Sequence, residues 1–410
     1  MYISKWGMTI TEAQERIDVE RLRRGRLKRA LEQLKEKNLG AILCFDHGNI
    51  RYITGLQIPA WMRLGRHQYA FLAREAEPVI FARDLTFIRY YKETAPWVRV
   101  MLASSFARGC FGPLATEAIA TKIAEDVKNL MKEYGVEKEP LGVDFETPWE
   151  VIRALEKAGI KVTSGEDAML DARAQKLEEE IDCFRVASAI AEACFDEIRE
   201  NLRPGVKGNE LIGLVAKKVY ELGGEIAFTP VLCSGPLTNA PGPCRILAER
   251  VIRPGDLVYV DLVGITWMGY HICYYRNFVC GRATPEQKDV WQKCYDLQMD
   301  LLKTFRPGIS TKEIAEKIPE PEYWGWKEYW ETFPNAVCHG IGLSQYDKPW
   351  ISKLSLKYPM EIKENMVIAV ETFFAKKDQK HGVRIEDMIV IRPGGYELLT
   401  QYPWELIECT

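Results

Sequence analysis

The distribution of apolar positions divides the chain into two parts with different patterns. In the first part, Leu residues recur at helical spacing among charged residues over 18–37, and an apolar run at 41–45 predicts a buried strand. Residues 45–55 carry turn residues, and the runs "YAFLA" and "PVIFA" within 69–82 predict a pair of strands. This alternation predicts an α/β domain over residues 1–171.

The second part, residues 172–410, begins with long helical patterns and continues with strands. Residues 172–203 predict one long helix, which Pro204-Gly205 ends. A helix followed by Arg-Pro-Gly and a second helix occurs twice, at 203–205 and again at 306–308. This repetition indicates either a duplicated helix-and-strand unit or two helices that end alike by coincidence. Apolar runs predict strands at 227–233, 257–264, 270–280, 366–374, 383–392 and 397–401.

Composition narrows the possible partners and the compartment. A length of 410 residues suits about two domains, and a net charge of −3 gives no reason to expect nucleic acid or an anionic membrane as partner. No apolar run approaches the roughly 20 residues that a membrane helix needs, and the charged opening lacks the apolar segment of a secretory signal. The 11 Cys residues form no CxxC pair, so we expect reduced thiols and a cytoplasmic protein.

Four polar residues of the second part stand in contexts where polar residues are unusual. Asp261 lies in "LVYVDLV", Glu371 in "MVIAVETFF" and Glu386 in "VRIEDMIVI", while His339 lies in "AVCHGIGL" beside glycines. One such acid usually faces solvent from a strand, but three of them with a His suggest a shared pocket. Carboxylates that converge in a protein interior repel one another unless a cation neutralises them. Oxygen and imidazole donors suit Mn, Fe, Co or Zn.

These motifs, together with "NIRYITG", "RPGVKGNELI", "RPGDLVYVDL" and "IKENMVIAVE", resemble the pita-bread family of methionine aminopeptidase, aminopeptidase P, prolidase and creatinase. The resemblance implies an α+β fold, in which a smaller creatinase-type α/β domain (1–171) precedes a pita-bread catalytic domain (172–410). The stretches "SGPLTN", "HGIGL" and "GYELLTQYPWEL" resemble the dimethylsulfoniopropionate lyase branch, which cleaves a C–S bond in a small zwitterion. The resemblance therefore implies a hydrolase or a lyase.

The resemblance also implies a set of metal ligands, and this chain departs from it. Members of the family hold two metal ions with an Asp, a second Asp on the next strand, a His and two Glu. The first Asp, the His and the two Glu correspond to Asp261, His339, Glu371 and Glu386. The second Asp, which bridges both ions, is missing.

Two residues could take the place of the missing Asp. Counting back from Arg276 leads to Cys273, and a tighter hairpin would place His271 there instead. A Cys273 thiolate would restore the missing charge and favour a softer ion such as Zn or Fe. We expect one divalent transition metal (Fe, Zn or Mn). A metal-free site is the alternative, because creatinase works without a metal.

Catalytic residues follow from the same resemblance. His339 and Glu371 are expected to take part in catalysis, and Asp347 corresponds to an Asp that acts as base in the lyase branch, although a turn residue is the alternative. The stretch "TPVLCSGPLTNAPGPC" contains no His where the peptidases carry an assisting one. This absence argues against an ordinary aminopeptidase.

Other side chains are candidates for substrate binding. Trp61 and Arg63 suit a quaternary cation and a carboxylate, and an exposed loop is the alternative for both. Arg384 shares a strand face with Glu386, and Tyr274 adjoins Cys273. In two-domain relatives the partner's first domain lends residues to the site, so a homodimer is implied.

We therefore expect an enzyme that cleaves a C–N or C–S bond of a small polar or zwitterionic substrate at a modified metal site. A metal-free, creatinase-like hydrolase is one alternative. A non-catalytic protein that binds a small molecule is the other.

Overall fold

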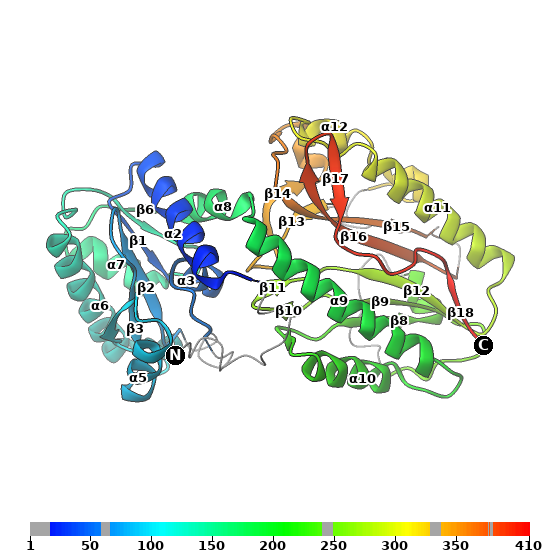
Figure 1. Cartoon of the computed structure of the whole chain (residues 1–410), viewed down its shortest axis with the longest axis horizontal. Coiled ribbons are helices and arrows are strands. Elements are labelled where there is room, and N and C mark those ends of the chain that lie inside the picture. Colours follow the sequence, from blue (N-terminus) through cyan, green and yellow to red (C-terminus); the bar gives the residue numbers. More distant parts are fainter. Residues whose placement is uncertain (1–16, 59–65, 240–248, 329–337, 376, 378–379) are drawn as a thin grey trace. The chain divides into compact units, whose positions relative to one another are not determined.

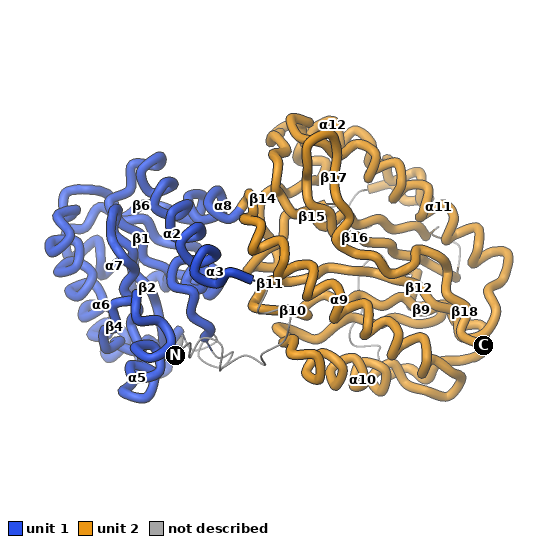
Figure 2. Tube along the Cα trace, in the orientation of Figure 1, with its two compact units in different colours: residues 1–173 blue, residues 174–410 orange. Residues whose placement is uncertain are grey.

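The computed structural model describes residues 17–58, 66–239, 249–328, 338–375, 377 and 380–410. It divides the chain into two compact units, residues 1–173 and residues 174–410, which Figure 2 shows in blue and orange. The sequence predicts this boundary between residues 171 and 172. No helix of the described residues combines the length and apolar character that crossing a bilayer requires.

The first unit is built on a six-stranded sheet with the strand order β4-β3-β2-β1-β5-β6 (Figure 1). Its strands are β1 (Ala41–Cys44), β2 (Tyr69–Ala73), β3 (Val79–Ala82), β4 (Arg99–Leu102), β5 (Leu141–Val143) and β6 (Val162–Ser164). Its α-helices are α2 (Val19–Glu36), α3 (His47–Thr54), α5 (Leu85–Thr94), α6 (Pro113–Glu133), α7 (Trp149–Lys157) and α8 (Glu166–Ala174). The sheet is mixed, because β2 is antiparallel to both neighbours while β4, β5 and β6 pair in parallel. This α/β arrangement agrees with the prediction.

One segment of this unit differs from its prediction. Residues 45–55, where the sequence indicates turns, contain helix α3. The Asp46 side chain accepts a hydrogen bond from the backbone N–H of Asn49, and Gly55, at a φ of 78°, ends the helix. The residues that suggested turns are therefore largely the capping residues of a short helix.

The second unit combines helices with three antiparallel or mixed sheets. Its α-helices are α9 (Glu178–Asn201), α10 (Gly208–Glu221), α11 (Pro285–Leu302) and α12 (Thr311–Ala315). The helix predicted over 172–203 is interrupted, because α8 ends at Ala174 and Gln175 forms a bridge with Met366 before α9 begins.

Two of its sheets carry the candidate site. A four-stranded sheet has the order β18-β12-β9-β8, a five-stranded sheet has the order β14-β13-β15-β16-β17, and a small sheet has the order β11-β10-β7. The strands are β7 (Glu225–Ile226), β8 (Val231–Ser234), β9 (Leu257–Asp261), β10 (Ile265–Trp267), β11 (Tyr270–His271), β12 (Tyr275–Cys280), β13 (Cys338–Gly340), β14 (Asp347–Ile351), β15 (Val367–Phe374), β16 (Val383–Arg392), β17 (Gly395–Leu398) and β18 (Ile407–Cys409).

Strands β12 and β16 join the two larger sheets. The Asn277 side chain donates to the backbone oxygen of Arg384 (2.5 Å) and accepts from its backbone N–H (3.3 Å). Arg276 donates to the backbone oxygen of Glu386 at 2.9 Å. Within the sheets, Asp261 lies opposite Tyr275 and Glu371 lies opposite Glu386. This arrangement brings acidic residues that are more than 100 positions apart in the chain into one region.

Candidate metal centre

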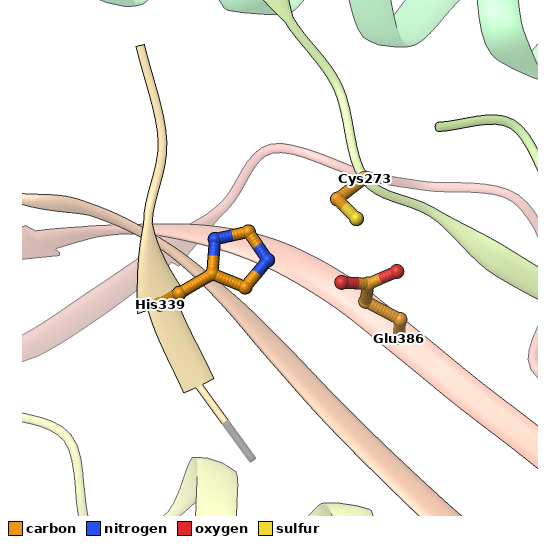
Figure 3. A group of neighbouring side chains, drawn as sticks. All are labelled: Cys273, His339 and Glu386. Carbon is orange, nitrogen blue, oxygen red and sulfur yellow. The ribbon is translucent and has the colours of Figure 1, made fainter. Parts of the chain in front are cut away.

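Three buried side chains from different segments converge in the second unit. Cys273 precedes β12, His339 lies in β13 and Glu386 lies in β16. Each offers one donor atom, and the three atoms lie within 4.8 Å of one another. Figure 3 shows the thiol, the imidazole and the carboxylate pointing toward one another. The structure therefore brings together three of the five predicted ligands as one compact donor set.

The imidazole of His339 is oriented by its own strand. Its Nδ1 lies 2.9 Å from the backbone oxygen of Gly340, so the neutral ring donates from Nδ1 and leaves the lone pair of Nε2 for another partner. A ligating His typically shows this second hydrogen bond to a carbonyl. Burial lowers the pKa of His339 to about 4, although the Gly340 carbonyl and the charge of Asp347 act in the opposite direction. The ring is therefore neutral at pH 7, as a metal ligand must be.

The carboxylate of Glu386 has the surroundings that best fit a bound cation. The residue is completely buried, and neither of its oxygens accepts a hydrogen bond of normal geometry from any described residue. Burial raises the pKa of Glu386 well above its usual range, the charges of Glu371 and Asp261 raise it further, and the Cys273 thiol lowers it. A buried carboxyl group without donors is costly unless a cation binds it. The two bare oxygens therefore fit a metal ion.

The Cys273 thiol completes this set. It is buried, and burial raises its pKa well above the usual range, as do the negative charges of Glu386, Asp261 and Glu371. A metal ion that binds sulfur reverses this effect, because a coordinating thiol is deprotonated. Sulfur, imidazole and carboxylate donors in one pocket fit a first-row transition metal or zinc.

The other two predicted ligands, Asp261 and Glu371, are not part of this compact set. Glu371 Oε1 lies 3.5 Å from Nη1 of Arg384. Asp261 Oδ1 accepts the backbone N–H of Val263 at 2.8 Å. Burial raises the pKa of Asp261 to about 7, and the Tyr275 hydroxyl and Arg384 lower it. Burial also raises the pKa of Glu371 to about 8, against the effect of Arg384.

Aromatic rings hold Arg384 in this position. The residue is completely buried, and its guanidinium carbon lies 4.8 Å from the ring centre of Phe373, 5.5 Å from Tyr259 and 5.6 Å from Tyr275. Rings at these distances stabilise a guanidinium electrostatically. Because an Arg does not lose its charge in a protein, the pocket contains a permanent cation next to Glu371.

The predicted base Asp347 lies in a buried ion pair. Its Oδ2 is 3.1 Å from Nζ of Lys176, and both side chains are inaccessible to solvent. A Cβ atom at Gly342 would come within 2.3 Å of this oxygen, so the pair requires glycine at that position. The structure does not bring Asp347 into the donor set, and a carboxylate held by Lys176 is poorly placed to act as a base.

Two further candidates lie away from the donor set. The Tyr274 hydroxyl accepts the backbone N–H of Tyr402 at 2.6 Å, and its ring packs edge-to-face on Phe195. The backbone N–H of His271 donates to the carbonyl of Gly342 at 2.9 Å, and its ring stacks on Phe228. Cys273 rather than His271 thus joins the donor set. Trp61 and Arg63, predicted to bind substrate, are outside the described residues.

Two exposed aromatic residues adjoin His339. The ring of Tyr346 lies 4.9 Å from the imidazole and that of Trp350 lies 6.3 Å from it. They are 58% and 38% exposed. Trp350 is not among the site residues that the sequence predicts. The sequence shows only that Trp350 follows Tyr346 by four positions, and the strand pairing is needed to place it opposite His339.

Comparison with known proteins agrees with this architecture. Residues 26–175 match the family model "Creatinase/Prolidase N-terminal domain", and residues 182–393 match the model "Metallopeptidase family M24". The Xaa-Pro dipeptidase of Pyrococcus horikoshii is 31% identical over 274 residues, which cover 65% of this chain and 74% of that protein. The dimethylsulfoniopropionate lyase DddP of Roseovarius nubinhibens is 26% identical over 406 residues, 95% of this chain and 87% of that protein.

Solved structures show the same fold. The Xaa-Pro dipeptidase from Bacillus anthracis superposes with a TM-score of 0.74 at 21% identity, covering 93% of this chain and 98% of that one. The prolidase from Pyrococcus horikoshii gives 0.73 at 24% identity, with coverages of 93% and 99%. These likenesses confirm the predicted creatinase-type N-terminal domain and pita-bread domain, and the relatives confirm a hydrolase or lyase. Enzymes of this kind normally bind divalent metal ions. The chain belongs to metallopeptidase family M24.

Proposed function

We propose that this protein is a metal-dependent enzyme that cleaves a C–N or C–S bond of a small zwitterionic substrate. One observation carries the proposal: a buried set of three donors, with two bare carboxylate oxygens, lies beside a carboxylate that an internal guanidinium holds in place. The bare oxygens of Glu386 have no obvious role in stability, since an unpaired buried acid destabilises a fold.

Cys273, His339 and Glu386 would hold the ion. A divalent ion there supplies Lewis-acid chemistry toward a carbonyl or carboxylate of the substrate. The burial of the three side chains would limit the access of competing water to it.

Glu371 is the residue we assign to proton transfer. Among the described acids of the site it is the most accessible, with 13% of its side chain exposed, whereas Asp261 and Glu386 are buried. Arg384 holds its carboxylate but is itself fully buried. We therefore assign Arg384 to positioning Glu371 rather than to contacting the substrate.

The exposed rings of Tyr346 and Trp350 support a substrate with a cationic group. Aromatic faces attract ammonium and sulfonium groups, and these two lie next to His339.

In an elimination, Glu371 takes a proton from the carbon next to the substrate carboxylate. The released electron pair forms a C=C bond while the C–S bond breaks and a neutral sulfide leaves. In hydrolysis, water is added across a C–N bond instead.

The lyase DddP matches more of this chain (95%) than the Xaa-Pro dipeptidase does (65%), whereas the dipeptidase is the more identical of the two in the matched part, at 31% against 26%. The missing His of the "TPVLCSGPLTNAPGPC" stretch disfavours ordinary peptide cleavage.

The test is turnover by purified protein supplied separately with zinc, iron or manganese. The panel contains sulfonium propionates, betaines, N-methyl amino acids and Xaa-Pro dipeptides. We expect turnover of one class, and a decrease in kcat of roughly 100- to 10,000-fold in Glu371→Gln. Glu364→Gln, an exposed change in the same unit, is the matched control and should leave kcat unchanged.

Two other results would replace the proposal. Tight binding of one compound without turnover of any would indicate a binding protein. Turnover that survives removal of all metal would indicate a metal-free hydrolase of the creatinase kind.

We also propose a homodimer, as the likeness to two-domain relatives implies. Light scattering of the full chain tests this directly. A monomer at working concentration would contradict it. The cytoplasmic location stays a prediction from the cysteine pattern.

A further inference from the structure

The five positions that correspond to metal ligands separate into two groups of different chemistry. Cys273, His339 and Glu386 converge within 4.8 Å. Glu371 instead lies 3.5 Å from Arg384, and Asp261 accepts the backbone N–H of Val263 at 2.8 Å. We infer that the site binds one metal ion, through a Cys–His–Glu set, and that the Cys273 thiolate selects a zinc-like ion over manganese. This inference deepens the proposed function, because it concerns the same site.

The number of ions follows from the donors that remain for a second ion. A carboxylate bridges two ions with two oxygens, whereas Cys273 offers one sulfur atom, which lies with His339 and Glu386. A second ion would depend on Asp261, one oxygen of which already accepts the N–H of Val263. Glu371, the other carboxylate that could hold it, already lies 3.5 Å from the permanent positive charge of Arg384. These conditions disfavour a second divalent ion.

The kind of ion follows from sulfur. Thiolates prefer zinc, cobalt and other thiophilic ions, while manganese and magnesium prefer oxygen. A set of one sulfur, one imidazole nitrogen and one carboxylate oxygen also has the three protein ligands typical of catalytic zinc, which leave a position open for a substrate. The bare, completely buried oxygens of Glu386 supply an independent sign that a cation belongs there.

The experiment measures metal binding by the full chain without substrate. Metal-free protein is titrated with zinc, cobalt and manganese by calorimetry, and the bound metal is counted by elemental analysis. We expect one ion per chain and an affinity for zinc at least about 100-fold above that for manganese. The cobalt form should show a near-ultraviolet sulfur-to-cobalt charge-transfer band.

Cysteine variants identify the sulfur. Cys273→Ser should lose the band, and Cys273→Ala serves if the Ser variant does not fold. Cys294→Ser is the matched control: this thiol is equally buried in the same unit but contacts Thr372 and the Val383 carbonyl, so its loss should leave the band intact. Cys273→Asp restores a bridging carboxylate and should raise the stoichiometry to two ions and weaken the preference for zinc.

Several results with wild-type protein would overturn the inference: two ions per chain, a preference for manganese, no band in the cobalt form, or no metal binding by folded protein. A band that persists in both Cys273 variants would also overturn it. Because no substrate is present, an enzyme that fails to turn over the panel yet binds one zinc ion through sulfur would refute the proposed function and leave this inference standing.

Discussion

The two faces of strand β16 each carry a buried carboxylate, and the two carboxylates differ in the hydrogen bonds they accept. Glu386 and Asp387 are neighbours in the chain, and both are completely buried. Glu386 receives no hydrogen bond of normal geometry from a described residue. Asp387, on the other face, accepts hydrogen bonds from Arg276 (2.7 Å), Gln298 (3.2 Å), Thr400 (2.9 Å) and Trp404 (2.8 Å). A carboxylate that the fold has satisfied is structural, and one that the fold leaves bare is available to a ligand.

The satisfied face also supports the bare one. Arg276 binds the carboxylate of Asp387 and, at the same time, the backbone oxygens of Glu386 (2.9 Å), Tyr275 (2.8 Å) and Tyr402 (2.8 Å). One guanidinium thereby ties β12, β16 and the C-terminal segment together. The ion pair of Arg276 and Asp387 therefore stabilises the backbone that carries Glu386.

The largest effect is expected on the satisfied face. Asp387→Asn leaves Arg276 buried without its counter-charge, which should lower the free energy of unfolding by about 3–5 kcal/mol. Urea denaturation of the metal-free protein measures this. Glu386→Gln is the matched control, and it should leave the stability of the metal-free protein unchanged or slightly higher, because no described residue gives Glu386 a hydrogen bond of normal geometry. Equal losses in both variants would break the comparison.

The affinity for metal should fall more in Glu386→Gln than in Asp387→Asn, the reverse of the order expected for stability. Glu386→Gln removes a charged donor, so the dissociation constant for zinc should rise by more than the roughly 10- to 100-fold that outer-shell partners cost. Asp387→Asn, in the fraction that stays folded, should bind zinc within that smaller range. Calorimetric titration at a temperature where both variants are folded gives both values. A larger loss of affinity in Asp387→Asn would mean that the faces are not separate.

The sequence could identify the acids of β16 but not distinguish them. "VRIEDMIVI" shows two carboxylates in one apolar run, and alternation places them on opposite faces. Which face forms the site depends on partners at positions 276, 298, 400 and 404, whose approach to the strand no local pattern encodes. The family resemblance supplied that choice, and it also pointed to Cys273 through the spacing from Arg276.

The same limit explains the case of Asp347. Its neighbours in the chain indicate a turn or a base, but its partner Lys176 is 171 positions away. A buried ion pair of this kind leaves no local signal. Helix α3, in contrast, was missed for a local reason, since capping and turn residues are chemically alike.

A third prediction tests whether Asp347 is a structural carboxylate like Asp387 or a functional one like Glu386. If it is structural, Asp347→Asn removes the carboxylate that lies 3.1 Å from the buried Lys176 ammonium and lowers the free energy of unfolding by several kcal/mol. The double variant Lys176→Met, Asp347→Leu should recover part of this loss and retain kcat per folded molecule. A loss of kcat of about 100-fold or more in the folded double variant would instead restore Asp347 as the base.

The smallest effect is expected at the exposed rings of Tyr346 and Trp350. They are grouped with Glu386 because they lie next to His339. Trp350→Leu keeps an apolar side chain but removes the ring that would attract a cationic substrate group, so KM should rise by roughly 2- to 10-fold, the value of a partly exposed cation–π contact. The affinity for zinc should stay unchanged, because Trp350 contributes no donor to the metal set. Trp149→Leu, an exposed Trp in the first unit, is the control and should alter neither value. The measurement is steady-state kinetics with a cationic substrate and its neutral isostere. A rise in KM of equal size for both compounds would show that Trp350 contributes only apolar surface, whereas a rise confined to the cationic compound would assign the ring to charge recognition.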